Sequence, residues 1–108
     1  MNWNKYSKAF EIFADTTATV AQKGNYDDYA NTYEVEELET VTGDLQGYSS
    51  TLAHEEYGLS IDCEGKFYCK DTIAKEGMYL IIGTSSYRIE KIRRARMGLM
   101  LFLKEVSL

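Results

Sequence analysis

The side chains in this sequence best suited to chemistry are two cysteines, Cys63 and Cys69, and one histidine, His54. Thiolates and imidazoles bind zinc, and a thiolate beside an imidazole can act as a nucleophile. Three such ligands without a Cys-x-x-Cys pair fall short of a tetrahedral structural zinc site. His54 lies beside Glu55 and Glu56, a poor setting for activating a thiol. We therefore expect a pair of thiols packed in the core, with no metal and no cofactor.

No other pattern of an enzyme active site occurs. The sequence contains no Ser-His-Asp grouping, no phosphate-binding glycine loop and no HExxH motif. The carboxylate pairs Asp27-Asp28 and Glu55-Glu56 are adjacent in sequence, so on a strand their side chains diverge and cannot act together on a substrate. We predict that the protein is not an enzyme; a small enzyme that uses one of its cysteines is the remaining alternative of that class.

Charge is distributed unevenly along the chain. The formal net charge is −5, which argues against autonomous nucleic-acid binding. Residues 26–57 contain nine Asp and Glu residues and no Lys or Arg. The candidate acidic surface consists of Asp27, Asp28, Glu36, Glu37 and Glu39. The candidate basic surface is a loop with Arg93, Arg94 and Arg96, whose guanidinium groups can bind phosphates or carboxylates at a hairpin tip.

Two interpretations of this charge distribution stay open. Complementary potentials can dock copies of the protein head to tail. Alternatively, both surfaces are simply solvated and keep the protein soluble.

The hydrophobic pattern predicts a mainly β fold that positions these residues. Residues 78–82, 87–92 and 99–106 are rich in Ile, Leu, Tyr and Phe, and the segments between them, 83–86 and 93–98, have the composition of turns. This pattern predicts a three-stranded antiparallel meander. In the outer two runs both the odd-numbered and the even-numbered residues are apolar, which is typical of strands covered on two sides.

The remainder of the chain predicts further strands and one or two short helices. A strand over 16–22 should end at a turn over 23–25, and a strand over 34–42 at a turn over 42–44. Glu64-Gly65 should turn a hairpin between 59–63 and 66–70. The predicted helices cover 3–14, from its aromatic spacing, and 51–57, with Ser50 or Thr51 as N-cap and Gly58 as the stop. Residues 25–33 fit a helical turn and a surface loop equally well.

The whole chain of 108 residues, 44% of them hydrophobic, suits one domain with its own core, spanning 1–108. Counting the predicted elements gives seven or eight short strands, the pattern of a small single-domain antiparallel β-barrel, SH3-like or similar. No apolar run reaches 18 residues and no signal-type segment opens the chain, so we expect no membrane contact and a reducing compartment.

Residues 44–63, Asp-Leu-Gln-Gly-Tyr-Ser-Ser-Thr-Leu-Ala-His-Glu-Glu-Tyr-Gly-Leu-Ser-Ile-Asp-Cys, resemble a segment of the tailed-phage head-closure proteins, also called head-tail joining, connector or minor capsid proteins. In that family an Asp-Ile-Gln-Pro-Tyr-Ser-like strand precedes an Ala-x-x-x-Tyr-Gly turn. The likeness continues through Ile-Ala-Lys-Glu-Gly-Met-Tyr-Leu-Ile at 73–81 and Tyr-Arg-Ile-Glu-Lys-Ile at 87–92, so it covers roughly 35–106. Gly47 stands where the family pattern has proline, which loosens the backbone there.

The resemblance implies a structural virion protein without an active site. Such a subunit is a small β-barrel that assembles into a homo-oligomeric ring at the head-tail junction, closes the DNA-filled head and connects it to the tail. The implied partners are the portal or adaptor protein, the tail or tail-terminator protein and the packaged DNA. The implied location is the virion, after assembly in the host cytoplasm. In this setting the arginines of 93–96 contact either a neighbouring subunit or DNA.

A different class of function also fits the composition. Nine tyrosines are present, and tyrosine is common both at interfaces and at the ends of small barrel cores. A monomeric SH3-like barrel could bind a peptide or another protein in an aromatic groove. This binding module is the alternative to the head-tail junction protein.

Overall fold

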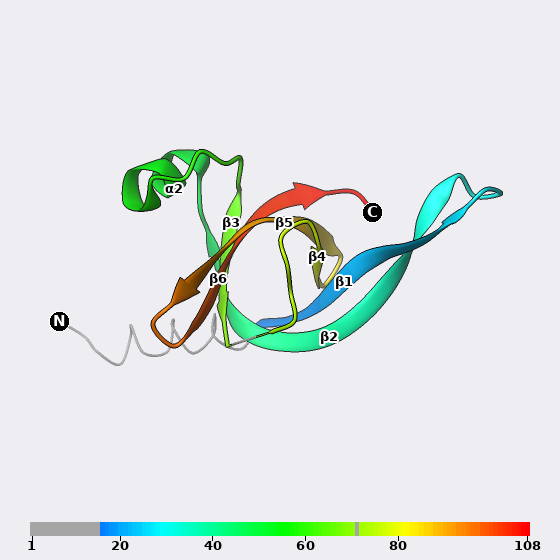
Figure 1. The fold of residues 1–108 in the computed structure, drawn as a ribbon, viewed down its shortest axis with the longest axis horizontal. Helices are drawn as coiled ribbons and strands as arrows, with labels where there is room; N and C mark the ends of the chain where they lie inside the picture. Colours follow the sequence, from blue (N-terminus) through cyan, green and yellow to red (C-terminus); the bar gives the residue numbers. More distant parts are fainter. Residues whose placement is uncertain (1–15, 71) are drawn as a thin grey trace.

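The computed structural model describes residues 16–70 and 72–108, and these form an antiparallel barrel with one short helix. Its elements are β1 (Thr16–Asp27), β2 (Thr32–Gly47), α2 (Ser50–Tyr57), β3 (Gly65–Cys69), β4 (Tyr79–Ile82), β5 (Ser85–Ala95) and β6 (Gly98–Val106). The strands pair in the order β1-β2-β3-β6-β5-β4, and β4 pairs back with β1 to close the sheet (Figure 1). The predicted mainly β, small antiparallel barrel is confirmed. The helix predicted over 3–14 lies outside the described residues.

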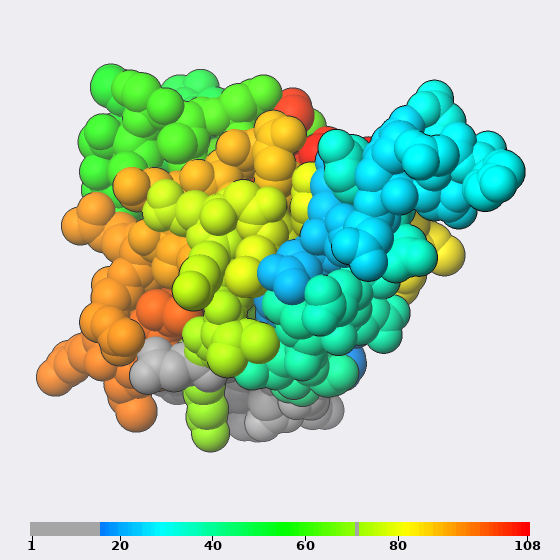
Figure 2. Space-filling view, turned by 45° about the vertical axis from the view of Figure 1, so that its right-hand side comes forward, coloured from blue at the N-terminus to red at the C-terminus, as the bar shows by residue number. Residues whose placement is uncertain are grey.

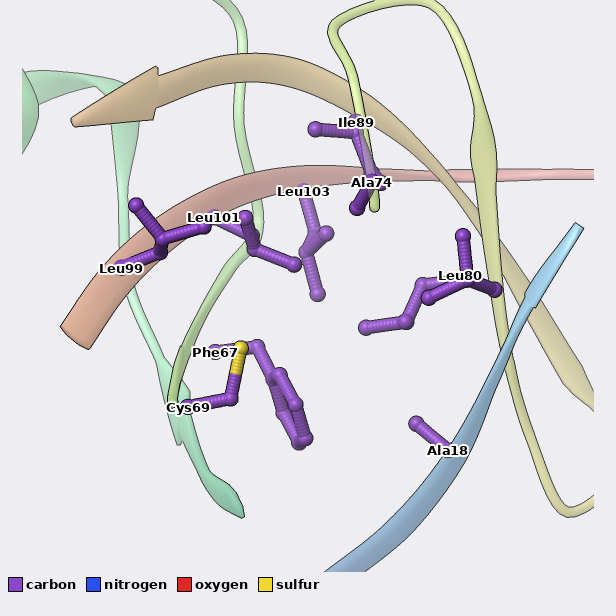
Figure 3. Packing of buried hydrophobic residues seen from close by; sticks show 10 residues of the cluster. Ala18, Phe67, Cys69, Ala74, Leu80, Ile89, Leu99, Leu101 and Leu103 are labelled. Atoms are coloured by element: carbon purple, nitrogen blue, oxygen red, sulfur yellow. The ribbon is translucent and has the colours of Figure 1, made fainter. Parts of the chain in front are cut away.

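The barrel interior is filled by side chains of one parity from each strand. On β6 these are Leu99, Leu101 and Leu103, which face Phe67 of β3 and Leu80 of β4 (Figure 3). Phe67, Leu80, Leu101 and Leu103 have no exposed surface, and burying a side chain of this size contributes about 1.5–3 kcal/mol. The cluster therefore holds strands together that are distant in sequence.

The opposite parity of β6 is also apolar because α2 covers the outer face of that strand. Phe102 is fully buried in a second cluster with Tyr48, Ala53 and Cys63, and Tyr57 packs against it. The prediction that the last run of the meander is covered on two sides is confirmed, and the meander itself consists of β4, β5 and β6.

The helix α2 begins and ends as its sequence predicts, within one residue. Ser49 is the N-cap, and its hydroxyl accepts a hydrogen bond from the Leu52 N–H at 3.2 Å. Gly58 adopts φ +68°, and its N–H donates to the carbonyls of Ala53 and His54, so the helix stops there.

The strand count was wrong, because the described residues form six strands rather than seven or eight. The predicted turn over 42–44 does not exist, since β2 runs through Gly43 to Gly47. Gly43 serves close packing instead: a Cβ there would lie 2.3 Å from the Tyr68 carbonyl oxygen and 2.8 Å from the Phe67 ring. The turn over 23–25 is likewise only a register shift within β1.

Two further predictions of local structure were wrong. No hairpin turns at Glu64-Gly65, because residues 58–64 have no strand partner and pack under α2. The segment 93–98 is not a loop, because Arg93, Arg94 and Ala95 continue β5 and pair with β6, and the turn contains only Arg96 and Met97. A register shift between Ile89 and Lys91 makes this longer strand possible, since it returns Ile92 to the barrel interior.

Candidate functional site

A long hairpin carries most of the predicted acidic surface beyond the barrel, while Glu39 pairs with Val20 within the barrel sheet. β1 pairs with β4 only at Thr19–Ala21, and β2 pairs with β3 only from Gly43 onward. Past those points β1 and β2 pair only with each other, out to the Asp27–Thr32 pair (Figure 1). We call residues 22–37 the acidic hairpin. Residues 25–33, for which the sequence left a helical turn and a loop open, are its end.

The turn of the acidic hairpin is held by its own side chains. The Asp27 carboxylate accepts hydrogen bonds from the backbone N–H groups of Tyr29 at 2.9 Å and Ala30 at 3.3 Å. Asn31 has φ +54°, a conformation that Asn tolerates better than most residues, and its side chain accepts a hydrogen bond from the Tyr26 hydroxyl. The turn is therefore specified by short polar side chains, as an Asx-type turn is.

The five predicted acidic residues all lie on β1, β2 and the turn between them, but they do not share one face. Asp28, Glu36 and Glu37 are exposed, whereas Asp27 and Glu39 are half-buried. Glu36 and Glu37 are consecutive in an extended strand, so their side chains point to opposite faces of the hairpin. Negative charge therefore surrounds the hairpin rather than covering one side.

A pocket of about 200 Å³ lies along the acidic hairpin, from Lys23 and Val35 out to Asn31 and Thr32 beside its turn. It is lined by Tyr26, Tyr33, Val35 and Lys23, with Leu108 after the end of β6. The rings of Tyr26 and Tyr33 are edge to face, with centroids 5.0 Å apart. The Lys23 ammonium lies 5.0 Å from the centroid of the Tyr33 ring. The pocket thus offers aromatic surface with one cation already seated on it.

The three predicted basic residues lie at the β5–β6 end, but only one is in the turn. Arg93 and Arg94 belong to β5, and Arg96 precedes Met97 in the two-residue turn. The Arg93 guanidinium lies 5.2 Å from the centroid of the Tyr57 ring, a cation–π contact that ties β5 to α2. Met97 is 81% exposed, the most exposed large apolar side chain of the described residues after Tyr29.

The aromatic cluster beneath α2 is structural. Tyr48 packs on Phe102 and Tyr57, and the Lys66 ammonium lies 4.4 Å from the centroid of the Tyr48 ring. Burial and the Glu56 carboxylate raise the pKa of Tyr48 to about 12. Its hydroxyl donates to the Leu52 carbonyl at 3.3 Å, so the ring fixes the start of α2 on the end of β2.

The segment between α2 and β3 is fastened by Lys104 of β6. Its ammonium contacts the Glu64 carboxylate at 2.7 Å and that of Asp62 at 3.1 Å. Hydrogen bonds to Glu64 and Asp62 raise the pKa of Lys104. These ion pairs hold residues 58–64 against the barrel, where the sequence had predicted a strand.

The two thiols are buried, but they do not form a pair. Cys69 belongs to the barrel interior, and Cys63 belongs to the cluster beneath α2. Burial and the neighbouring Asp62 and Glu64 carboxylates raise the pKa of Cys63, which keeps the thiol protonated and weakly nucleophilic. The predicted hairpin of 59–63 and 66–70 would have placed both cysteines in neighbouring strands. That placement was wrong for Cys63, which lies in the irregular segment before β3. Within 16–70 and 72–108, no cluster of three His, Cys, Asp or Glu residues could hold a metal ion.

Sequence reasoning missed the pocket and the role of Met97 as the end of a tight turn. Tyr26 and Tyr33 pair directly across the acidic hairpin, yet their separation of seven residues also fits a helix, so spacing alone could not bring the rings together. Gly98 was read as part of a loop, but it pairs with Ala95 and places Met97 at the tip.

Comparisons with known proteins give no relative from which a role could be transferred. No family model matches the chain, and no curated protein is significantly similar to it. In the described part of the chain, no helix has the length and apolar character needed to cross a membrane.

Proposed function

We propose that this chain is a structural subunit of the phage head-tail junction, which assembles into a ring that closes the DNA-filled head and connects it to the tail. The observation that carries the proposal is the position of the two charged hairpins. The acidic hairpin and the β5–β6 turn project at opposite ends of the barrel (Figures 1 and 2). Complementary surfaces at opposite ends of a subunit support head-to-tail contacts, which close into a ring when the rotation between copies allows.

The sequence resemblance gives the proposal its biological setting. Its first part, 44–63, forms the end of β2, the helix α2 and the segment fastened by Lys104, and its later parts, 73–81 and 87–92, fall largely on β4 and β5. The first part is one packed unit that joins the barrel sheet to the helix on its outer face. Its one thiol, Cys63, is buried, whereas its histidine, His54, lies exposed on α2, which supports a scaffolding role over a Cys–His nucleophile. A scaffolding role fits such a unit.

The decisive experiment deletes the gene in the phage or prophage that encodes it. Virion particles are then examined by electron microscopy and by sensitivity of their DNA to nuclease. We expect DNA-filled heads without tails, loss of packaged DNA and free tails, all reversed by the wild-type gene supplied in trans. Tailed, DNA-retaining particles in normal numbers would overturn the proposal.

The pocket along the acidic hairpin favours one second candidate, a monomeric module that binds a peptide or protein in an aromatic groove. Tyr26 and Tyr33 are 46% and 49% exposed there, so their rings are accessible to a peptide. Affinity capture with the tagged chain from cells producing the phage separates the candidates. Portal, adaptor or tail proteins support the junction, whereas one host regulatory protein supports the module.

A further inference from the structure

The tip of the β5–β6 hairpin presents a largely exposed apolar side chain. Met97 is 81% exposed and stands next to Arg96, beyond the last strand pair, Ala95 and Gly98. A flexible thioether at such a position costs solubility without helping the barrel core, from which it points away. Methionine adapts its shape to a partner and makes favourable contacts between sulfur and aromatic rings. The side chain is therefore suited to insertion into an aromatic pocket.

The pocket along the acidic hairpin has the matching chemistry. Tyr26, Tyr33 and Val35 line it and are each between 41% and 49% exposed. Its volume of about 200 Å³ has room for one long side chain. Lys23 already lies over the Tyr33 ring, and its ammonium repels a second cation. An apolar side chain is therefore a better occupant of the pocket than an arginine.

Charge around the two features favours the same pairing. Arg96 is exposed beside Met97, while Asp28 is exposed in the turn of the acidic hairpin and Glu37, which alternates in phase with Tyr33 and Val35 along β2, is exposed on the face that carries the pocket. A methionine that enters the pocket brings its neighbouring guanidinium to this acidic surface. Opposite potentials orient such an encounter, and like potentials oppose tip-to-tip or hairpin-to-hairpin contacts.

We propose that Met97 of one copy inserts into the Tyr26–Tyr33 pocket of the next copy, with Arg96 facing the acidic hairpin around it. The inference rests on the proposed ring and supplies its subunit contact. The turn and the hairpin that carries the pocket lie at opposite ends of the molecule, as the orange and cyan surfaces in Figure 2 show, so each copy can contact one neighbour through its turn and another through its pocket. The contact is heterologous and repeats around an axis.

Disulfide trapping between purified copies tests this contact without any phage component. One copy carries Met97→Cys and the other, with a different tag, carries Val35→Cys. Leu52→Cys replaces the second partner in the control, because Leu52 of α2 is 39% exposed and Val35 is 41% exposed. We expect the Met97–Val35 heterodimer to form at least about tenfold faster than the control, because docking raises the local concentration of the two thiols. Equal rates would overturn the proposal.

A second pair of variants shows whether the rings are responsible. Tyr33→Ala in the Val35→Cys copy should remove the rate advantage, whereas Tyr29→Ala should retain it, because Tyr29 lies on the same hairpin outside the pocket. Retention of the advantage with Tyr33→Ala contradicts a ring-lined site. The trapping and gene-deletion experiments have independent outcomes. A head-closure defect on deletion without trapping rejects this contact alone, and trapping without a head-closure defect on deletion rejects the junction alone.

Discussion

At the scale of single residues, glycine and arginine have roles here that their types alone do not reveal. Gly43 is surrounded by backbone and ring atoms of β3, and the arginines of the β5–β6 hairpin differ in their surroundings. Arg93 lies over Tyr57, whereas Arg96 occupies the turn. Substitution of Gly43 therefore tests folding, whereas substitution of Arg96 tests assembly.

Gly43→Ala should destabilise the barrel strongly. The new methyl group would lie 2.3 Å from the Tyr68 carbonyl oxygen, and backbone on a paired strand cannot move aside cheaply. We expect a loss of about 1–3 kcal/mol or more in the free energy of unfolding, measured by urea denaturation. Gly47→Ala is the control, because it lies on the same strand with no atom within 4 Å, and it should change stability by less than about 0.5 kcal/mol. Equal effects of the two substitutions would show that close packing is not the reason for Gly43.

The sequence predicted local structure well where a single residue decides it. Ser49 and Gly58 bound α2, with the N-cap one residue before the predicted position, because a capping hydroxyl and a left-handed stop act locally. Gly43 was misread because glycine indicates both turns and close backbone approach, and only the position of β3 distinguishes them. The pocket was missed because Tyr33 and Leu108 are brought together by strand pairing across most of the chain.

At the scale of elements, the fold has two cores that share one strand. β6 contributes Leu101 to the barrel interior and Phe102 to the cluster beneath α2. The sequence predicted this double burial from apolar residues on both parities of 99–106. It did not predict that the segment before β3 is irregular, because that segment is fixed by ion pairs to Lys104, by packing on α2 and by a few backbone hydrogen bonds at Glu64 rather than by a continuous strand ladder.

The attachment of α2 to this second core should weaken in alkali. The pKa of Tyr48 is raised from its usual value of 10.0 to about 12, so the folded state holds the hydroxyl proton more tightly than the unfolded state. That contribution to stability is complete below about pH 10 and is lost as the pH rises toward 12. We expect wild-type stability, measured by urea denaturation at a series of pH values, to fall in this window.

Tyr48→Phe isolates this titration. The variant loses the hydrogen bond to the Leu52 carbonyl, so at pH 8 it should be less stable by about 1 kcal/mol. It lacks the titrating hydroxyl, so the difference from wild type should narrow between pH 10 and 12. Tyr29→Phe, on a fully exposed ring of the acidic hairpin, should match wild type at pH 8. A constant difference for Tyr48→Phe across the window would contradict the assignment of the alkaline loss to this ring.

At the scale of the whole molecule, the described chain is elongated, 58 × 28 × 21 Å, because the acidic hairpin extends away from the barrel. A hairpin of this length contributes little to either core, since its end residues are exposed. A paired ribbon that extends beyond the barrel is better explained as a surface for contacts with a partner than as support for the core. The charged features at the two ends give the molecule a direction, which a self-complementary two-fold contact would not require.

This direction predicts a dominant defect from one-sided variants. A copy with Arg96→Glu and Met97→Glu cannot insert its tip into a neighbour, yet its own pocket still accepts a wild-type tip. Because every heterologous ring needs every contact, one such copy interrupts the ring that contains it. Co-expression with wild type should therefore lower the fraction of tailed, DNA-retaining particles far below the share expected from simple dilution, as counted by electron microscopy. Adding Tyr33→Ala and Val35→Glu removes the pocket as well, so the variant defective at both ends should no longer enter rings and should lose its dominance. Equal inhibition by the one-sided and the two-sided variants would contradict a directional contact between the β5–β6 turn and the acidic hairpin.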